Sequence, residues 1–479
     1  MKNLSFIGAA LVLVSVFFTS ITGPGCAVVM NPSGGRRDSL PPVLLKASPN
    51  DSTNNFTSNH ITLTFDEFVQ LQDIQKELIV SPIPKRQPEV EARLRTIYIR
   101  IRDTLQPNTT YTFNFGKSIR DVNEGNIFKN YSYLFATGPT FDSLTLSGRV
   151  ILAENGRPDS TLVVILHTSG EDSAVFNARP LYLATLDSSG RFNFRNLPAG
   201  TFYVYALEDQ GGAHRYLSEQ QKFAFADSPV VLENRPGPVT LFAYSRKKQA
   251  AVAAPTTSRL PSPIGPKPKP GNANSENRLR LQTNIQNGQL DLLGNLTVSS
   301  EKPLRKLDTT RIHFSTDTTY TPVTDFSLLR DTSNSVLTFQ YKWKENTLYH
   351  VVLEKEFAED TSGRQLLKAD TITFTTKKLS DYGSLKIRFR NYDQAVNPVL
   401  LFIQNDQVTK SIPLNSAVLD QQIFPPGDYE MRLLHDRNGN GKWDPGDFFG
   451  KHLQPEIVVP VSRKITVKPN WENDFDIAL

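Results

Sequence analysis

The feature that most constrains the fold of this chain is a two-residue hydrophobic period. Apolar and polar residues alternate in 61–65, 95–101 and 110–115, and each run is bounded by Pro, Asn, Asp or Gly. Successive side chains of a β-strand point to opposite faces, so this alternation is typical of strands with one buried face. After the first apolar segment no stretch sustains a helical period over several turns, although 69–78 is compatible with one short helix. The sequence therefore predicts an all-β protein.

The size and charge of the chain narrow its class further. A length of 479 residues is too great for one hydrophobic core and suggests roughly three or four domains. The net charge of +5 is spread along the chain without long blocks of one sign. Such a distribution gives no electrostatic footprint for a polyanion, so we expect no nucleic-acid partner.

The N-terminus predicts export and a lipid anchor. Lys2 precedes an apolar segment, 4–18, that is too short for an ordinary membrane span and is typical of an export signal. Cys26, the only cysteine, follows the small residues 23–25, although Gly23 stands where lipoprotein signals usually carry an aliphatic residue. We expect cleavage before Cys26, an N-terminal diacylglycerol or fatty acyl modification on Cys26, and a place in the cell envelope, on the outer membrane. The alternative is a plain secretory signal with a free thiol.

An internal repeat organises the rest of the chain. Residues 108–137 correspond to 346–376, and 197–209 correspond to 424–436, in the same order and at similar offsets. The simplest account is a unit of two domains, A then B, present twice and joined by a Pro-rich linker. The predicted segments are a signal peptide (1–25), a flexible tether (26–40), A1 (41–139), B1 (140–243), a Pro-rich linker (244–277), A2 (278–377) and B2 (378–479).

The linker has six prolines between Pro255 and Pro270. Such a composition favours an extended spacer, and the alternative is a docking peptide for an aromatic groove. As a spacer it would bury little surface, so the halves 41–243 and 278–479 are expected to fold independently.

Several motifs carry a family resemblance. The segments that resemble the bacterial Ig-like domain of the S-layer type, as found in lipoproteins of the Bacteroidetes group, are 38–43, 47–51, 61–68 and 105–111. The segments similar to carboxypeptidase-regulatory or Cna-B-like sandwiches are 147–150, 187–194 and 196–200. These resemblances imply β-sandwich spacer or adhesion-type modules, and a fold shared by so many functions names no mechanism.

A catalytic constellation is not evident in the sequence. There is no Gly-x-Ser-x-Gly, no His-Glu-x-x-His and no Gly-x-x-x-x-Gly-Lys motif, and the seven histidines stand singly. Glycosidase chemistry requires two carboxyl groups at a defined separation across a cleft. The adjacent carboxylates Asp66 and Glu67 have no such partner in the sequence, so a solvated strand edge is the simpler interpretation. We expect the protein not to be an enzyme.

One loop has the pattern of a calcium site. Oxygen-bearing side chains occupy positions one, three, five, nine and twelve of an EF-hand-type loop, Gly441 stands at six, and position seven would offer its carbonyl. The predicted ligands are Asp436, Asn438, Asn440, Lys442, Asp444 and Asp447. The alternative is a polar hairpin, because Asn438-Gly439 and Asn440-Gly441 are turn dipeptides. The equivalent loop of B1, from Asp209, lacks most of these oxygens and is expected not to bind metal.

The sequence as a whole predicts a lipid-anchored envelope protein that acts as a structural scaffold or interaction module. Its partners would be the membrane, through the lipid, and an envelope protein or glycan. The alternative is a surface glycan-binding protein or adhesin, with Trp343, Trp443 and Trp471 as candidate platforms, although each tryptophan is also a candidate for core packing.

Overall fold

The computed structural model describes residues 38–209, 211–233, 236–246 and 278–479. Outside these residues lie the predicted signal peptide, Cys26, the tether up to residue 37 and the linker from residue 247. The chain divides into two compact units, one of residues up to 143 with 196–198, and one of 144–195 with 199–479. The described residues confirm the all-β prediction, with tandem Ig-like β-sandwiches. No helix among them is long and apolar enough to cross a membrane.

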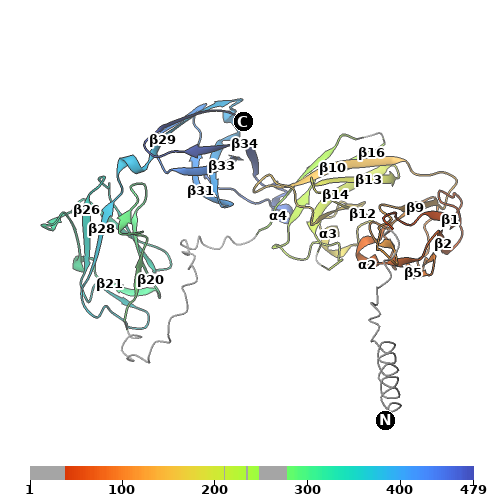
Figure 1. Ribbon diagram of the computed structural model, residues 1–479, viewed down its shortest axis with the longest axis horizontal. Helices are drawn as coiled ribbons and strands as arrows, with labels where there is room; N and C mark the ends of the chain where they lie inside the picture. Colours follow the sequence, from red (N-terminus) through yellow and green to blue (C-terminus); the bar gives the residue numbers. More distant parts are fainter. Residues whose placement is uncertain (1–37, 210, 234–235, 247–277) are drawn as a thin grey trace, which may run out of the picture. The chain divides into compact units, whose positions relative to one another are not determined.

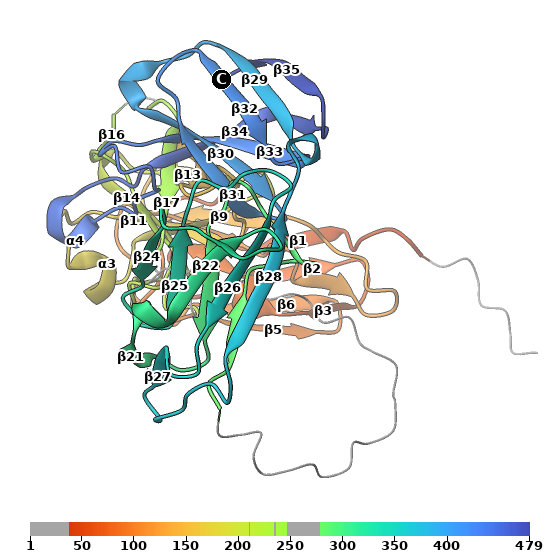
Figure 2. The ribbon, with the colours of Figure 1, turned by 90° about the vertical axis from the view of Figure 1, so that its left-hand side faces the viewer.

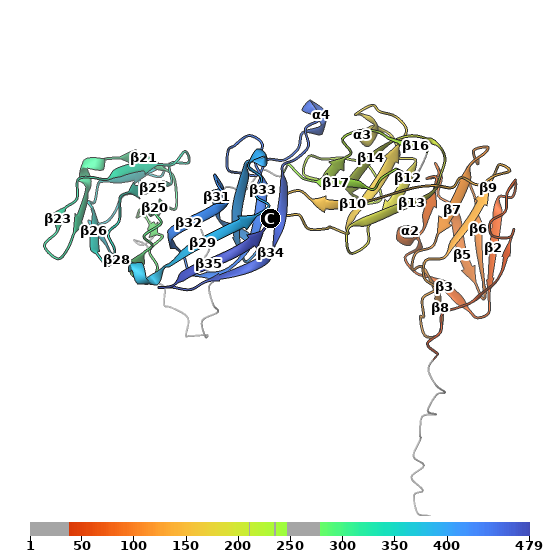
Figure 3. The ribbon, with the colours of Figure 1, turned by 90° about the horizontal axis from the view of Figure 1, so that it is seen from above.

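A1 packs two antiparallel sheets against each other, in the orders β1-β2-β6-β5 and β4-β7-β9, with β3-β8 as a separate pair (Figure 3). Alternate residues of the first sheet, such as Leu63 and Ile97, meet the fully buried rings of Phe113 and Phe135 from the second. The short helix α2 (Ile74–Glu77) follows β3, in the stretch where the sequence allowed one. The strands are β1 (Leu44–Ser48), β2 (His60–Phe65), β3 (Val69–Leu71), β4 (Ile79–Ser81), β5 (Glu89–Arg93), β6 (Thr96–Arg100), β7 (Thr110–Asn114), β8 (Ile119–Asp121) and β9 (Ser132–Ala136).

B1 has sheets in the orders β13-β10-β17 and β12-β11-β14-β15, and β16 also pairs with β14 (Figure 1). The first and last strands of the domain, β10 and β17, pair in parallel. Its helix is α3 (Ala174–Asn177). The strands are β10 (Leu144–Leu152), β11 (Leu162–His167), β12 (Tyr182–Thr185), β13 (Arg191–Leu197), β14 (Gly200–Glu208), β15 (Phe223–Phe225), β16 (Val230–Leu232) and β17 (Val239–Ala243).

A2 has sheets in the orders β18-β20-β25-β24 and β19-β28-β26-β22-β23, with β21-β27 as a separate pair. Its core joins Phe339 of one sheet to Phe314, Tyr349 and Phe374 of the other, and Trp343 packs against the same rings. The 3-10 helix η2 spans Thr309–Arg311. The strands are β18 (Leu281–Thr283), β19 (Gln289–Leu290), β20 (Leu296–Ser300), β21 (Leu304–Leu307), β22 (Ile312–Thr316), β23 (Thr321–Pro322), β24 (Ser327–Arg330), β25 (Val336–Gln340), β26 (Leu348–Leu353), β27 (Ala358–Asp360) and β28 (Asp370–Thr376).

B2 has sheets in the orders β32-β29-β35 and β31-β30-β33-β34 (Figure 2). As in B1, the first and last strands pair in parallel, β29 with β35. The internal repeat itself stays a prediction from the sequence. The helices are η3 (Leu379–Asp381), η4 (Gln394–Val396) and α4 (Phe448–Lys451). The strands are β29 (Gly383–Arg390), β30 (Pro398–Gln404), β31 (Gln407–Pro413), β32 (Val418–Phe424), β33 (Gly427–His435), β34 (Ile457–Val467) and β35 (Glu472–Ala478).

The linker was expected to bury little surface between the halves, and the structure places B1 and B2 in contact within the second unit. Independent folding of the two halves stays a prediction. The backbone N–H of Val458 donates to the carbonyl of Ala153 at 2.8 Å, and the Arg157 guanidinium lies 2.9 Å from Asp406. Further contacts come from residues 436–456, an excursion between β33 and β34. A hydrophobic period describes strands and not the docking of a loop, so the sequence did not indicate this contact.

Candidate functional site

The excursion 436–456 holds all six predicted metal ligands. Asp436 comes directly after β33, and its carboxylate is almost fully buried, with 2% of the residue exposed. It accepts backbone N–H groups of Gly439 at 2.8 Å, Asn440 at 3.3 Å and Gly441 at 2.6 Å. The two glycines have φ of 71° and 75°, a region that side chains rarely adopt, so they let the backbone curl around this carboxylate. Asp436 is therefore the anchor of the loop.

Three of the other predicted ligands come together beside it. The amide nitrogens of Asn438 and Asn440 donate to the same oxygen of Asp444, at 2.6 and 2.7 Å. The side-chain oxygen of Asn440 accepts the N–H of Lys442 at 2.7 Å. The loop thus gathers two carboxylates and two amides, and its polar groups are satisfied by one another.

A residue that the sequence did not indicate, Glu456, completes this cluster. It lies just before β34, is 2% exposed, and accepts the N–H of Arg437 at 2.8 Å and of Asp444 at 3.0 Å. Burial raises the pKa of Glu456, and the nearby charges of Asp436 and Asp444 raise it further. Glu456 lies outside the twelve-residue loop pattern, so only the fold could place it here.

Asp447, predicted as the closing ligand, has other partners. Its carboxylate caps α4, accepting the N–H of Gly450 at 3.0 Å, and forms an ion pair with Arg246, which follows the last strand of B1. The structure therefore brings Asp436, Asn438, Asn440 and Asp444 together with Glu456 but engages Asp447 elsewhere.

The charge available for a cation is limited. Among the described residues no group of three or more His, Cys, Asp or Glu side chains is arranged so that it could hold a metal ion. In B1 the corresponding Asp209 accepts the N–H of His214 at 2.8 Å. As it stands, the B2 loop is a hydrogen-bonded polar turn with one buried acid beside it.

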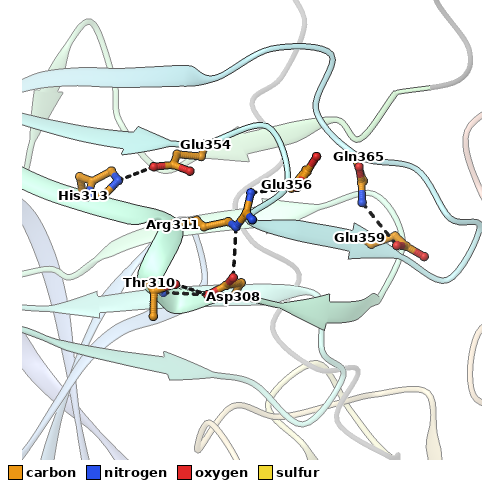
Figure 4. Close-up of polar contacts among 8 residues, drawn as sticks. All are labelled: Asp308, Thr310, Arg311, His313, Glu354, Glu356, Glu359 and Gln365. Carbon is orange, nitrogen blue, oxygen red and sulfur yellow. Dashed lines mark hydrogen bonds and ion pairs between the residues drawn. The ribbon is translucent and has the colours of Figure 1, made fainter.

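The remaining candidates lie apart from this loop. Trp443 packs on the second face of the B2 sheet and donates to the carbonyl of Glu456 at 2.7 Å, whereas Trp471 is 63% exposed. Figure 4 shows surface pairs of A2, in which His313 lies 2.7 Å from Glu354 and Arg311 bridges Asp308 and Glu356. Exposed pairs of this kind contribute little to stability.

The fold defines a class: tandem Ig-like β-sandwiches. Residues 38–137, about a fifth of the chain, match the family of bacterial Ig-like domains. No curated protein matches the chain.

Similar solved structures include the Bacillus anthracis TIE protein, 11% identical over 94% of this chain and 75% of that one, with a TM-score of 0.17. The major pilin subunit BcpA of Bacillus cereus is 9% identical over 70% of this chain and 98% of that one, with a TM-score of 0.17. The N-terminal part of the S-layer protein SbsC is 14% identical over 43% of this chain and 44% of that one, with a TM-score of 0.15.

Proposed function

We propose that this protein is a non-enzymatic scaffold or interaction module of the cell envelope, anchored in the outer membrane by lipid on Cys26. Its sandwich domains bind other envelope components or act as spacers that keep such components at a distance from the membrane. The chain has no catalytic role. The observation that carries the proposal is that the buried aromatic and acidic side chains of the sandwiches have structural partners. Aromatic rings fill the cores, and buried carboxylates such as Asp121 and Asp360 close loops by accepting backbone N–H groups.

The perturbed side chains fit this role. Burial raises the pKa of Tyr133 and Tyr205 to about 12, and both side chains are buried in sandwich domains. Catalytic sites concentrate perturbed groups where a substrate can reach them. The match of residues 38–137 to bacterial Ig-like domains agrees with a structural module.

The anchor is tested by Cys26→Ser in cells fed a fatty-acid analogue. Wild type should be labelled and sediment with membranes, whereas the variant should be unlabelled and soluble, because the acyl chains supply the membrane affinity. An unlabelled wild-type protein would refute the lipid anchor.

A second candidate function is glycan binding, favoured by Trp471. Its ring is 63% exposed on a turn of B2, and the Lys468 ammonium lies 5.0 Å from its centroid. An exposed indole offers an apolar face to a sugar ring. Binding of the full chain to envelope glycans that is abolished by Trp471→Ala would favour this function over a scaffold.

For the B2 loop we propose a weak structural calcium ion, held by Asp436, Asn438, Asn440, the Lys442 carbonyl and Asp444. What supports it is the ligand spacing, with two carboxylates and two amides gathered in one loop.

Calorimetric titration of the full chain should give a dissociation constant of about 10⁻⁴ to 10⁻³ M, as in extracellular modules. Asp444→Asn should weaken binding at least tenfold, and Asp447→Asn should leave it unchanged. If wild type shows no heat at millimolar calcium, the loop is only a polar hairpin.

A further inference from the structure

The outer face of one B1 sheet carries a surface of aromatic side chains. Tyr205 on β14 lies directly opposite Phe225 on β15, and Leu207 lies opposite Phe223, so these four side chains share one face. The opposite face of β14 is also buried, at Val204 and Ala206. A strand that is apolar on both faces needs a cover on each, and we call the outer one, formed by Tyr205, Phe223 and Phe225, the B1 aromatic face.

B2 supplies part of the cover of this face, beside Tyr216 of B1, whose ring lies 4.7 Å from Phe223 between centroids. Phe448 of α4 lies 5.6 Å from Tyr205, 5.2 Å from Phe223 and 4.9 Å from Phe225 between ring centroids. Phe448 is 4% exposed, although it stands in the excursion and not among the core residues of B2. The next residue, Phe449, stacks on Tyr216 at 5.4 Å.

Polar contacts surround these rings on both sides. The Arg246 side chain donates to the carbonyl of Gly446 at 3.2 Å and pairs with Asp447, and His452 lies 2.9 Å from Asp172. Gly446 has no room for a side chain, because a Cβ there would lie 2.7 Å from the Tyr244 ring. A buried apolar centre with a polar rim is the anatomy of a specific protein interface.

We propose that residues 446–453 of B2 are a docking segment for the B1 aromatic face, and that this contact holds the two halves of the chain together without the linker. The occupant is fixed by the chain itself, and its anchor is Phe448. A break in the Pro-rich linker would then leave A2 and B2 attached to the half that carries Cys26. This inference goes beyond the proposed function and does not depend on a lipid or a metal.

The test inserts a site-specific protease sequence into the full chain between Pro255 and Pro270. After cleavage we expect the halves to elute together in gel filtration and to separate on a denaturing gel. Because the anchor is apolar, co-elution should persist in 1 M salt, where the Debye length falls to about 3 Å. Separation of the cleaved wild-type halves without denaturant, at low or high salt, would overturn the proposal.

Matched variants locate the interaction. Phe448→Ser should raise the dissociation constant of the cleaved halves at least tenfold while the near-ultraviolet spectrum of the uncleaved chain shows that the domains remain folded. Trp471→Ser removes an exposed ring from the same domain and should leave co-elution intact. Equal retention by both variants would show that the docking segment does not hold the halves.

Discussion

Removing the Asp121 carboxylate should destabilise A1 by several kcal/mol. Asp121 is 1% exposed and accepts the N–H groups of Glu124 at 2.6 Å, Gly125 at 2.8 Å and Asn126 at 2.7 Å. Burial alone would raise the pKa of Asp121, and these hydrogen bonds outweigh it and lower the pKa. In Asp121→Ala three donors lose a charged partner. At about 1 kcal/mol each, since water can reach this half-buried loop, the loss is about 3 kcal/mol.

Scanning calorimetry of the full chain should show the A1 transition about 12 °C lower or more, since 1 kcal/mol corresponds to about 4–8 °C in a domain of this size. Hydrogen exchange should accelerate in peptides covering 119–127. Glu67→Gln is the control: burial first and the charge of Asp121 next raise the pKa of Glu67, so neutralising it should cost no stability. The effect of pH has a fixed sign. The contribution of Asp121 is complete above its unfolded pKa of about 3.9 and is lost as pH falls through its lower folded pKa. An Asp121→Ala chain within about 0.5 kcal/mol of wild type at pH 7 would refute the reasoning, because that is the scatter of ordinary surface substitutions.

Three further predictions concern the other domains. Burial lowers the pKa of His167, which is 3% exposed, so B1 should lose stability as pH falls below the unfolded pKa of about 6.5, and His167→Gln should flatten that dependence between pH 7 and 5; an unchanged slope would contradict this. Phe339→Ala should cost A2 about 3–5 kcal/mol in urea unfolding followed by Trp343 fluorescence, because the ring is fully buried in the same core, and a loss under about 1 kcal/mol would show that the core collapses around the gap. Gly148→Ala should destabilise B1 by about 1–3 kcal/mol, since its Cβ would meet the Val239 carbonyl across the parallel pair, whereas Gly237→Ala, with open space, should not; equal calorimetric effects would exclude this cause.

The sequence predicted best where one face of a strand is buried. The alternating segments 61–65, 95–101 and 110–115 correspond to β2, β6 and β7. In a half-buried strand successive side chains point alternately to the core and to solvent, so the sequence alternates as well. No such prediction was possible where both faces of a strand are covered. β30 is buried at six successive positions, and its continuous apolar run does not indicate which neighbour covers each face. The candidate site shows the same limit. Asn438, Asn440 and Asp444, close in the sequence, contact one another, whereas Glu456 accepts the N–H of Asp444 only because β34 returns beside β33.

B1 and B2 close the second face of their sheets in different ways, and this difference makes them partners. In B2 the second face, at Leu401 and Val458, is covered by Trp443 from its own excursion. The same excursion then continues past Gly446 and places Phe448 on the B1 aromatic face, where it helps to bury Phe223 and Phe225. The second face of the B2 sheet is thus covered from within B2, whereas the B1 aromatic face is covered in part by Phe448 of B2. Because an uncovered aromatic face is costly in water, the contact follows from the apolar surface that B1 would otherwise expose.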